Sequence, residues 1–165
     1  MRGSDATSKT QQVIVYSVAD VAADKQDRKS VMGGGFTIDE MPISWTCNKQ
    51  TEVSLSTMEA EYTAASVMGT ELLGIRALLQ EIGLKIELPM SLCADNQAAV
   101  KQLGSEATSA KANHVDVRIK FVNVYAEEGL LKPEYCEGVH MLADLLTKAL
   151  EAPRLLTLRG LIALL

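Results

Sequence analysis

The chain has 165 residues, of which 47% are hydrophobic and 22% are charged, and its formal net charge is -5. This length and balance predict one globular domain and exclude a chain that is disordered throughout. No apolar run approaches the roughly 20 residues that a membrane-spanning helix needs. The acidic balance disfavours a free-standing nucleic-acid binder, so any affinity for phosphates has to come from a local patch or a neighbouring module.

The N-terminus is polar and lacks the apolar core of a secretory signal peptide. We expect residues 1–11 to form a disordered leader and residues 12–165 to form the domain. Three cysteines without metal-ligand spacing, each in or beside an apolar segment, predict reduced and buried thiols: Cys47, Cys93 and Cys136. These features favour an intracellular location, cytoplasmic or nuclear, and secretion stays open if a signal peptide was removed.

β-branched and aromatic residues predict three strands in the first third of the chain, over residues 12–17, 33–38 and 42–47. The last two form a hairpin around residues 39–41, and the charged residues 24–30 form a loop. Three consecutive glycines, Gly33 to Gly35, have no phosphate-loop spacing. They predict a bulged or tightly packed start of a strand.

The clearest helix covers residues 57–82. Its members spaced by four and three residues form one stripe: Glu61, Ala65, Met68, Leu72, Ile75, Leu79 and Ile82. Gly83 is a natural stop signal. Glu61 is the only charged member of the stripe, and a charge on an apolar face is costly unless it is paired or bound to a metal.

The remaining pattern predicts a strand over residues 90–93, a helix over 97–103, a loop over 104–112, a helix over 114–128, a strand over 132–136, and helices over 139–150 and 154–165. The order is a β-meander followed by alternating helices and strands. It predicts an α/β fold with a mixed sheet flanked by helices.

Three acids, Glu61, Asp95 and Asp144, converge if the two helices that carry Glu61 and Asp144 pack beside the central strands. Two divalent cations about 4 Å apart need several convergent carboxylates. Each acid also has a purely structural alternative: Asp95 as the N-cap of the next helix, Asp144 at the positive end of its helix, and Glu61 as a buried, paired carboxyl. From the residues alone, the prediction is an acidic cluster in an α/β domain.

Six segments in a characteristic order resemble the ribonuclease H domain that closes the polyprotein of Ty1/copia-type retrotransposons. They are Tyr16-Ser-Val-Ala-Asp-Val-Ala-Ala-Asp24 with Asp27-Arg-Lys-Ser30, Ile43-Ser-Trp45 with Lys49-Gln50, Leu55-Ser-Thr-Met-Glu-Ala-Glu-Tyr62, Asp95-Asn-Gln97, His114-Val-Asp-Val-Arg118 and Ala143-Asp-Leu-Leu-Thr-Lys-Ala-Leu150. Any one of them is a weak signal. Their common order and spacing, over residues 13–161, make the resemblance strong.

The resemblance implies a ribonuclease H-like fold, with a five-stranded mixed sheet and helices on both faces. It implies cleavage of the RNA strand of an RNA–DNA hybrid with two magnesium or manganese ions, and a reverse transcriptase domain upstream. Carried over residue by residue, it makes Glu61, Asp95 and Asp144 the catalytic metal ligands.

Two positions depart from the family's pattern. The family's first metal-binding aspartate follows Tyr-Ser at the end of the opening strand, and here that position is Val18. The tryptophan usual three residues later is Val21. Asp20 lies two residues beyond Val18, roughly 6–7 Å further along a strand. The family often has an acid there too, so we do not expect Asp20 to compensate.

Neither histidine is expected to act in catalysis. His140 is too close to Asp144 for the loop histidine common in ribonucleases H, and His114 belongs to a motif suited to packing or capping. Losing one anionic ligand from a two-ion site misplaces the nucleophilic water, which typically costs at least about 10²-fold in rate. Two hypotheses follow: a ribonuclease H with impaired or residual activity, or a repurposed, non-catalytic interaction or nucleic-acid-binding module on the same fold.

Overall fold

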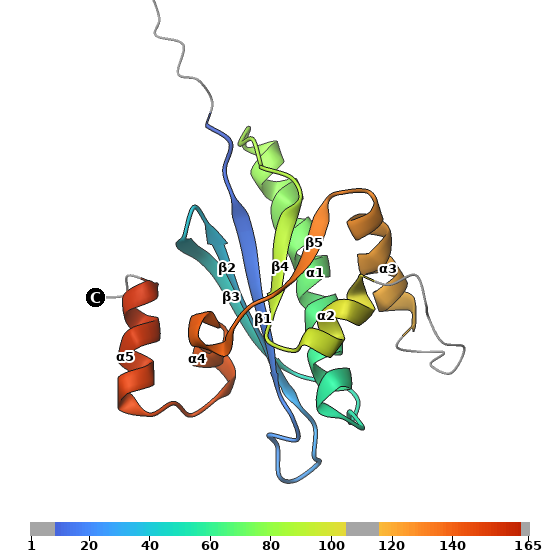
Figure 1. Cartoon of the computed structure of the whole chain (residues 1–165), viewed down its shortest axis with the longest axis vertical. Coiled ribbons are helices and arrows are strands. Elements are labelled where there is room, and N and C mark those ends of the chain that lie inside the picture. Colours follow the sequence, from blue (N-terminus) through green and yellow to red (C-terminus); the bar gives the residue numbers. More distant parts are fainter. Residues whose placement is uncertain (1–8, 105–115, 163–165) are drawn as a thin grey trace, which may run out of the picture.

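The computed structural model describes residues 9–104 and 116–162, and in this part of the chain a five-stranded sheet lies between two groups of helices (Figure 1). The strands are β1 (Val13–Asp20), β2 (Val31–Ile38), β3 (Met41–Lys49), β4 (Met90–Ala94) and β5 (Leu131–Tyr135), in the spatial order β3-β2-β1-β4-β5. The first three strands are antiparallel, and β4 and β5 continue the sheet in parallel with β1. The predicted mixed sheet is confirmed.

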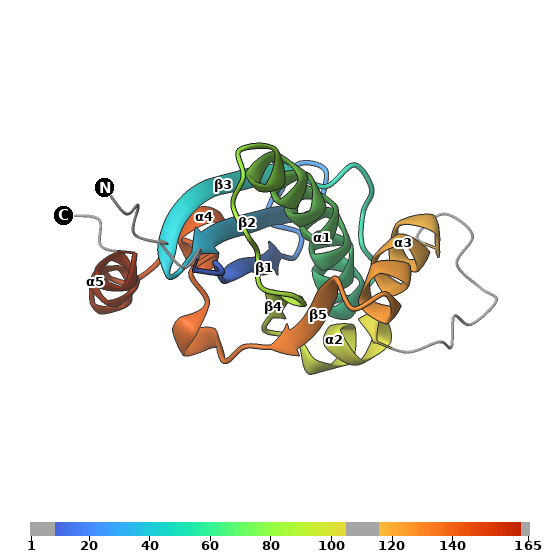
Figure 2. The ribbon, with the colours of Figure 1, turned by 90° about the horizontal axis from the view of Figure 1, so that it is seen from above.

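Helices of very different lengths cover the two faces of the sheet. The long helix α1 (Thr57–Glu81), α2 (Gln97–Leu103) and α3 (Asp116–Glu127) lie on one side, and α4 (Asp144–Thr147) and α5 (Ala152–Leu161) lie on the other (Figure 2). Residues 105–115, which include His114 and all but the first residue of the predicted loop, are outside the described residues. None of the helices described is both long enough and apolar enough to pass through a membrane.

Helix α1 contributes more buried residues to the main core than any other element. Ala65, Met68, Leu72 and Leu79 of the predicted stripe are buried against β1, β2 and β4, whereas Ile82, just past the helix, is 65% exposed. The helix begins at an N-cap, where the Ser56 hydroxyl accepts a hydrogen bond from the backbone N–H of Glu59. These contacts fix the first turns of α1, and therefore Glu61, relative to the sheet.

Two glycines let helices approach β2 closely from opposite faces. A Cβ atom on Gly34 would lie 2.0 Å from the Met68 sulfur of α1, and one on Gly33 would lie 2.7 Å from Cγ2 of Thr147 in α4. The prediction of a tightly packed strand is correct, because any side chain at these positions would separate a helix from the sheet.

Strand β1 is longer than predicted and runs through to Asp20. Its residues alternate between the two faces of the sheet. Ala19 packs with Ala60 and Ala64 of α1, whereas its neighbour Val18 packs on the opposite face. The hairpin between β2 and β3 turns through Asp39 and Glu40, whose φ angles of 46° and 69° have the sign required by a two-residue type I′ turn.

The prediction of one helix over residues 139–150 is wrong. The structure has a short 3-10 turn, η1 (Gly138–His140), and then the four residues of α4. Met141 and Ala143, between the two, are fully buried against Val18. A continuous helix would point residues two apart in different directions, so covering Val18 with both requires the non-helical link.

The last helix and one cysteine also differ from expectation. Helix α5 covers Ala152–Leu161, two residues earlier at its start than predicted, with a proline in its first turn. Cys93 is buried and Cys136 is half-buried, but Cys47 is exposed on the edge strand β3. The Cys47 thiol donates a hydrogen bond to the carbonyl oxygen of Leu146, and so contacts the segment that carries Asp144.

Candidate active site

A cleft of about 410 Å³ opens where β1 and β4 end beside the first turns of α1. Its walls include Ala19, Asp20, Glu61, Asp95 and Lys148. Ala94 at the end of β4 pairs in parallel with Ser17 of β1, so Asp95 leaves the sheet beside the end of β1. The acids predicted from distant parts of the sequence therefore reach one region of the fold.

Glu61 is the most buried carboxyl of the cleft. It is 4% exposed, and its Oε2 accepts a hydrogen bond of 3.0 Å from the backbone N–H of Ala19. Burial, followed by the negative charge of Asp95, raises the pKa of Glu61 to about 8, and the Ala19 N–H and the positive charge of Lys148 only partly oppose this shift. In the metal-free chain Glu61 is therefore mostly protonated at neutral pH.

Asp95 follows β4 and is half-buried. The hypothesis that it caps α2 is wrong, because Asn96 is the N-cap and its side-chain oxygen accepts from the N–H of Ala99 at 3.0 Å. Burial raises the pKa of Asp95, the charge of Lys148 lowers it, and the charge of Asp144 raises it. Its carboxyl is thus free of capping and lines the cleft.

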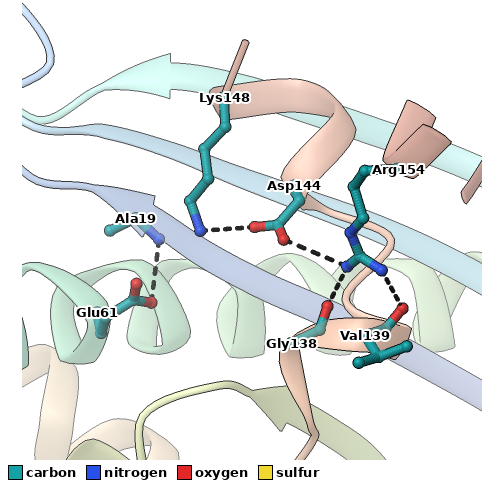
Figure 3. A network of polar contacts seen from close by, with 7 residues as sticks. All are labelled: Ala19, Glu61, Gly138, Val139, Asp144, Lys148 and Arg154. Atoms are coloured by element: carbon teal, nitrogen blue, oxygen red, sulfur yellow. Dashed lines mark hydrogen bonds and ion pairs between the residues drawn. The ribbon is translucent and has the colours of Figure 1, made fainter. Parts of the chain in front are cut away.

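Asp144 is the first residue of α4 and is 7% exposed. Its Oδ1 lies 2.7 Å from Nζ of Lys148, and its Oδ2 lies 3.5 Å from a guanidinium nitrogen of Arg154 (Figure 3). The position at the start of a helix agrees with the structural alternative for Asp144. The two ion pairs nevertheless show that its charge is balanced mainly by side chains.

Lys148 and Arg154 are the site residues that sequence reasoning missed. Lys148 ends α4 four residues after Asp144, a spacing that favours an ion pair on a helix and would have identified it. Arg154 comes from α5 and also donates to the carbonyl oxygens of Gly138 and Val139. Nothing in the local sequence predicts that contact, because it depends on how α5 folds back beside η1.

Several acidic neighbours stabilise the protonated, positively charged form of Lys148. Burial lowers its pKa, but the hydrogen bond to Asp144 and the charges of Asp144, Asp95 and Glu61 outweigh this effect and raise the pKa above its ordinary value. In Figure 3 the Lys148 side chain extends from the end of α4 toward the carboxyl groups of Asp144 and Glu61. Lys148 is therefore a cation among the carboxyl groups of the cleft.

Val18 is completely buried on the face of β1 that α4 covers. Its methyl groups pack with Met141 and Ala143, and the partly buried Tyr16 and Cys136 border the same cluster. The Val18 side chain itself has no oxygen that a cation could use. At this position, where the resemblance led us to expect a carboxyl group, the structure has an apolar contact.

Carboxylates are suitable ligands for Mg²⁺, but the placement of these groups does not make a ready ion site. Among the described residues, no group of three or more His, Cys, Asp or Glu side chains is arranged to hold a metal ion. One Glu61 oxygen is bonded to a backbone N–H and both Asp144 oxygens face cations. His140 is exposed in η1 and does not line the cleft.

Solved structures define the class of fold. LC11-RNase H1, isolated from compost by a metagenomic approach, superposes with a TM-score of 0.60 over 82% of this chain and 92% of that chain, at 16% identity. The N-terminal RNase H domain of Rv2228c from Mycobacterium tuberculosis gives a TM-score of 0.57 over 84% and 91% of the two chains, at 10% identity. The chain therefore has the ribonuclease H fold.

Sequence relatives identify the lineage. The chain is 36% identical over 133 residues to the retrovirus-related Pol polyprotein from transposon TNT 1-94 of Nicotiana tabacum, and 32% identical over 135 residues to that from transposon RE1 of Arabidopsis thaliana. The matches cover 81% and 82% of this chain but only 10% and 9% of the polyproteins. The homologues of this chain are thus Ty1/copia-type retrovirus-related Pol polyproteins, as the motifs predicted.

One further relative matches only part of the chain. The chain is 40% identical over 57 residues to the secreted RxLR effector protein 161 of Plasmopara viticola, which covers 34% of this chain and 40% of that protein. No protein-family profile matches the sequence.

Proposed function

We propose that this chain is a retrotransposon-type ribonuclease H-like domain whose nuclease reaction, metal-dependent cleavage of RNA in RNA–DNA hybrids, is lost or strongly impaired. The observation that carries the proposal is that the side chain of Val18 in β1 is completely buried against the segment leading into α4. In this proposal an apolar side chain, packed against Met141 and Ala143, stands where the family has a metal-binding carboxylate. The fold is kept while one anionic ligand is missing.

In this proposal Glu61, Asp95 and Asp144 are the catalytic and metal-binding carboxylates that remain of a two-ion site. Glu61 and Asp95 line one cleft, and Asp144 is paired with Lys148 of the same cleft; this supports the assignment, since the charges of Asp95 and Asp144 both act on Glu61. We expect Mg²⁺ or Mn²⁺ to bind weakly, because the remaining acids face cations or backbone N–H groups of the chain itself. Asp20 lines the same cleft but lies on β1 beyond the position of Val18.

The proposed nucleic-acid partner is an RNA–DNA hybrid. LC11-RNase H1, which shares the fold at a TM-score of 0.55, has been crystallised in complex with an RNA/DNA hybrid. The lineage also suggests an upstream reverse transcriptase domain, because the matched region is about a tenth of each polyprotein. An intracellular location follows from the same proposal.

A second candidate function is a repurposed, non-catalytic interaction or nucleic-acid-binding module on the same fold, and of these two the interaction module is the one that specific observations favour. The similarity to the Plasmopara viticola effector supports it, because a segment of this sequence recurs there under the name of a secreted effector and not of a polyprotein. The net charge of -5 points the same way, since a nucleic-acid-binding surface is usually basic. This function predicts a folded chain with no measurable affinity for a hybrid.

The test is cleavage of an end-labelled RNA–DNA hybrid in magnesium and in manganese by three proteins: the unmodified chain, Val18→Asp, and Val18→Asp combined with Asp95→Asn. We expect cleavage only by the single reversion. Robust cleavage by the unmodified chain would refute the role given to Val18. No cleavage by the well-folded single reversion would refute the assignment of the three carboxylates. Binding of an uncut hybrid, measured in the same reactions, separates the two candidate functions.

A further inference from the structure

Lys148 is a basic residue in the wall of a cleft whose other charged lining residues are acids. Its Nζ lies 2.7 Å from Oδ1 of Asp144, and its side chain is 35% exposed. It lines the cleft together with Glu61 and Asp95, and it interacts electrostatically with both of them. The ammonium group is therefore placed among the same oxygens that a divalent ion would have to use.

Arg154 is a second cation beside the Asp144 carboxylate. Arg154 approaches Oδ2 at 3.5 Å, while its guanidinium also donates to the carbonyl oxygens of Gly138 and Val139. Figure 3 shows Lys148 and Arg154 reaching Asp144 from its two sides. One fixed cation thus faces each oxygen of this carboxylate, and both come from the chain itself.

A divalent ion and this ammonium cannot share the same carboxylates without strong repulsion between like charges. Mg²⁺ in addition demands oxygen ligands at about 2.0–2.1 Å in near-octahedral geometry. Val18 contributes no ligand that would favour the ion over the lysine. The observed arrangement consequently satisfies the carboxylates with an internal cation.

We propose that Lys148 is the resident cation of this cleft: its ammonium group pairs with Asp144, lines the cleft together with Asp95, and competes with divalent cations for these carboxylates. The chain is then folded and charge-balanced without metal, and its affinity for Mg²⁺ is low for two separate reasons, the missing carboxylate and the competing lysine. The identity of the carboxylates rests on the proposed function, but the competition is measured without nucleic acid or catalysis.

The experiment compares four forms of the full chain by isothermal titration calorimetry with MgCl₂ and by thermal unfolding in chelator or in millimolar magnesium. Lys148→Met removes the charge and keeps the apolar stem, and Lys148→Arg keeps the charge. Lys85→Met is the matched control, because Lys85 is exposed and lies away from the cleft. The unmodified chain is the fourth form.

We expect the unmodified chain, Lys148→Arg and Lys85→Met to give no binding heat and no magnesium-dependent change of Tm. Lys148→Met should lose several degrees of Tm in chelator, recover part of the loss in magnesium, and bind Mg²⁺ at least about tenfold more tightly than the unmodified chain. Equal magnesium affinities of the unmodified chain and Lys148→Met would overturn the inference.

A measurement on the unmodified chain keeps the inference testable if Lys148→Met does not fold. Mn²⁺ broadens NMR signals near its binding site, so substoichiometric Mn²⁺ should leave the amide signals of Glu61, Asp95 and Asp144 sharp. Selective broadening of these signals would show that an ion enters despite Lys148, and would overturn the inference. Because no hybrid is present in these measurements, a negative outcome for the competition by Lys148 does not count against the proposed ribonuclease H-like function. Conversely, absence of cleavage by Val18→Asp does not count against the competition.

Discussion

Introducing at position 18 the carboxyl group that the proposed function requires, by Val18→Asp, is predicted to destabilise the chain in the absence of divalent cations. Val18 is 0% exposed and packs against Met141 and Ala143, which are also fully buried. Fully burying a valine contributes about 1.5–3 kcal/mol, and placing an unpaired polar group at the same point costs a further 1–3 kcal/mol or so. A loss of about 3–5 kcal/mol is a large part of the 5–15 kcal/mol typical of whole domains.

The assay is thermal and urea unfolding in chelator as a function of pH. At about 2–4 °C per kcal/mol for a chain of this size, the predicted loss corresponds to a Tm lower by roughly 6–20 °C. The buried carboxyl has a pKa raised above its unfolded value by desolvation. Its electrostatic penalty is absent below the unfolded pKa and grows as pH rises toward the folded pKa, so the variant is weakest at neutral and alkaline pH.

Val18→Asn is the matched control for this prediction. Asparagine has nearly the shape of aspartate but does not titrate, so its defect should be independent of pH between 4 and 8 or so. Millimolar magnesium should raise the Tm of Val18→Asp and leave Val18→Asn unchanged. If Val18→Asp in chelator at neutral pH is as stable as the unmodified chain, the apolar environment inferred for this position is wrong.

Three further substitutions test the packing and the electrostatics. Gly34→Ala places a Cβ atom 2.0 Å from a buried methionine sulfur and should lower the free energy of unfolding in urea by about 1–3 kcal/mol. Gly35→Ala is the control: its Cβ atom would meet no atom within 4 Å, so the substitution should be neutral or slightly stabilising. Equal effects of the two substitutions would contradict the close approach of α1. Glu61 has a pKa of about 8 in the folded chain against 4.5 in the unfolded chain, so its negative charge destabilises the fold progressively as pH rises from 4.5 to 8. Glu61→Gln should therefore be more stable than the unmodified chain at pH 9 but not at pH 4. Parallel plots of unfolding free energy against pH for the two proteins would refute this burial cost. Arg154→Gln removes the cation that joins α5 to η1 and should lower the free energy of unfolding by about 1–3 kcal/mol, with unchanged stability counting against a structural role for that contact.

Much of the fold was accessible from sequence periodicity, and the reasons are local. The stripe of α1 repeats over about six turns, and β-branched runs mark β1 and β4, so these elements and their types were predicted correctly. The segment from η1 to α4 was predicted as one helix because its apolar residues also fit a helical period. Its real path depends on covering Val18, a contact between parts of the chain more than 120 residues apart that no local pattern records.

The candidate site was predictable in part for the same reason. Glu61 stood out as the single charge on an apolar stripe, and the resemblance supplied Asp95 and Asp144. The cations were harder to find: Lys148 has a recognisable spacing from its partner, but Arg154 meets Asp144 only through the fold. A carboxylate motif in the sequence therefore predicts which acids form the site, and the structure shows that side chains of the same chain pair with one of them, Asp144.

The central claim is that the cleft cannot catalyse hybrid cleavage as it stands because position 18 lacks a carboxyl group. The most direct measurement is the single-turnover rate of RNA cleavage in a labelled hybrid by Val18→Asp relative to the unmodified chain, at equal enzyme and magnesium concentrations. A ratio of at least about 10² is predicted from the loss of alignment in the unmodified cleft. Equal rates in the two proteins, both abolished by Asp95→Asn, would contradict the claim.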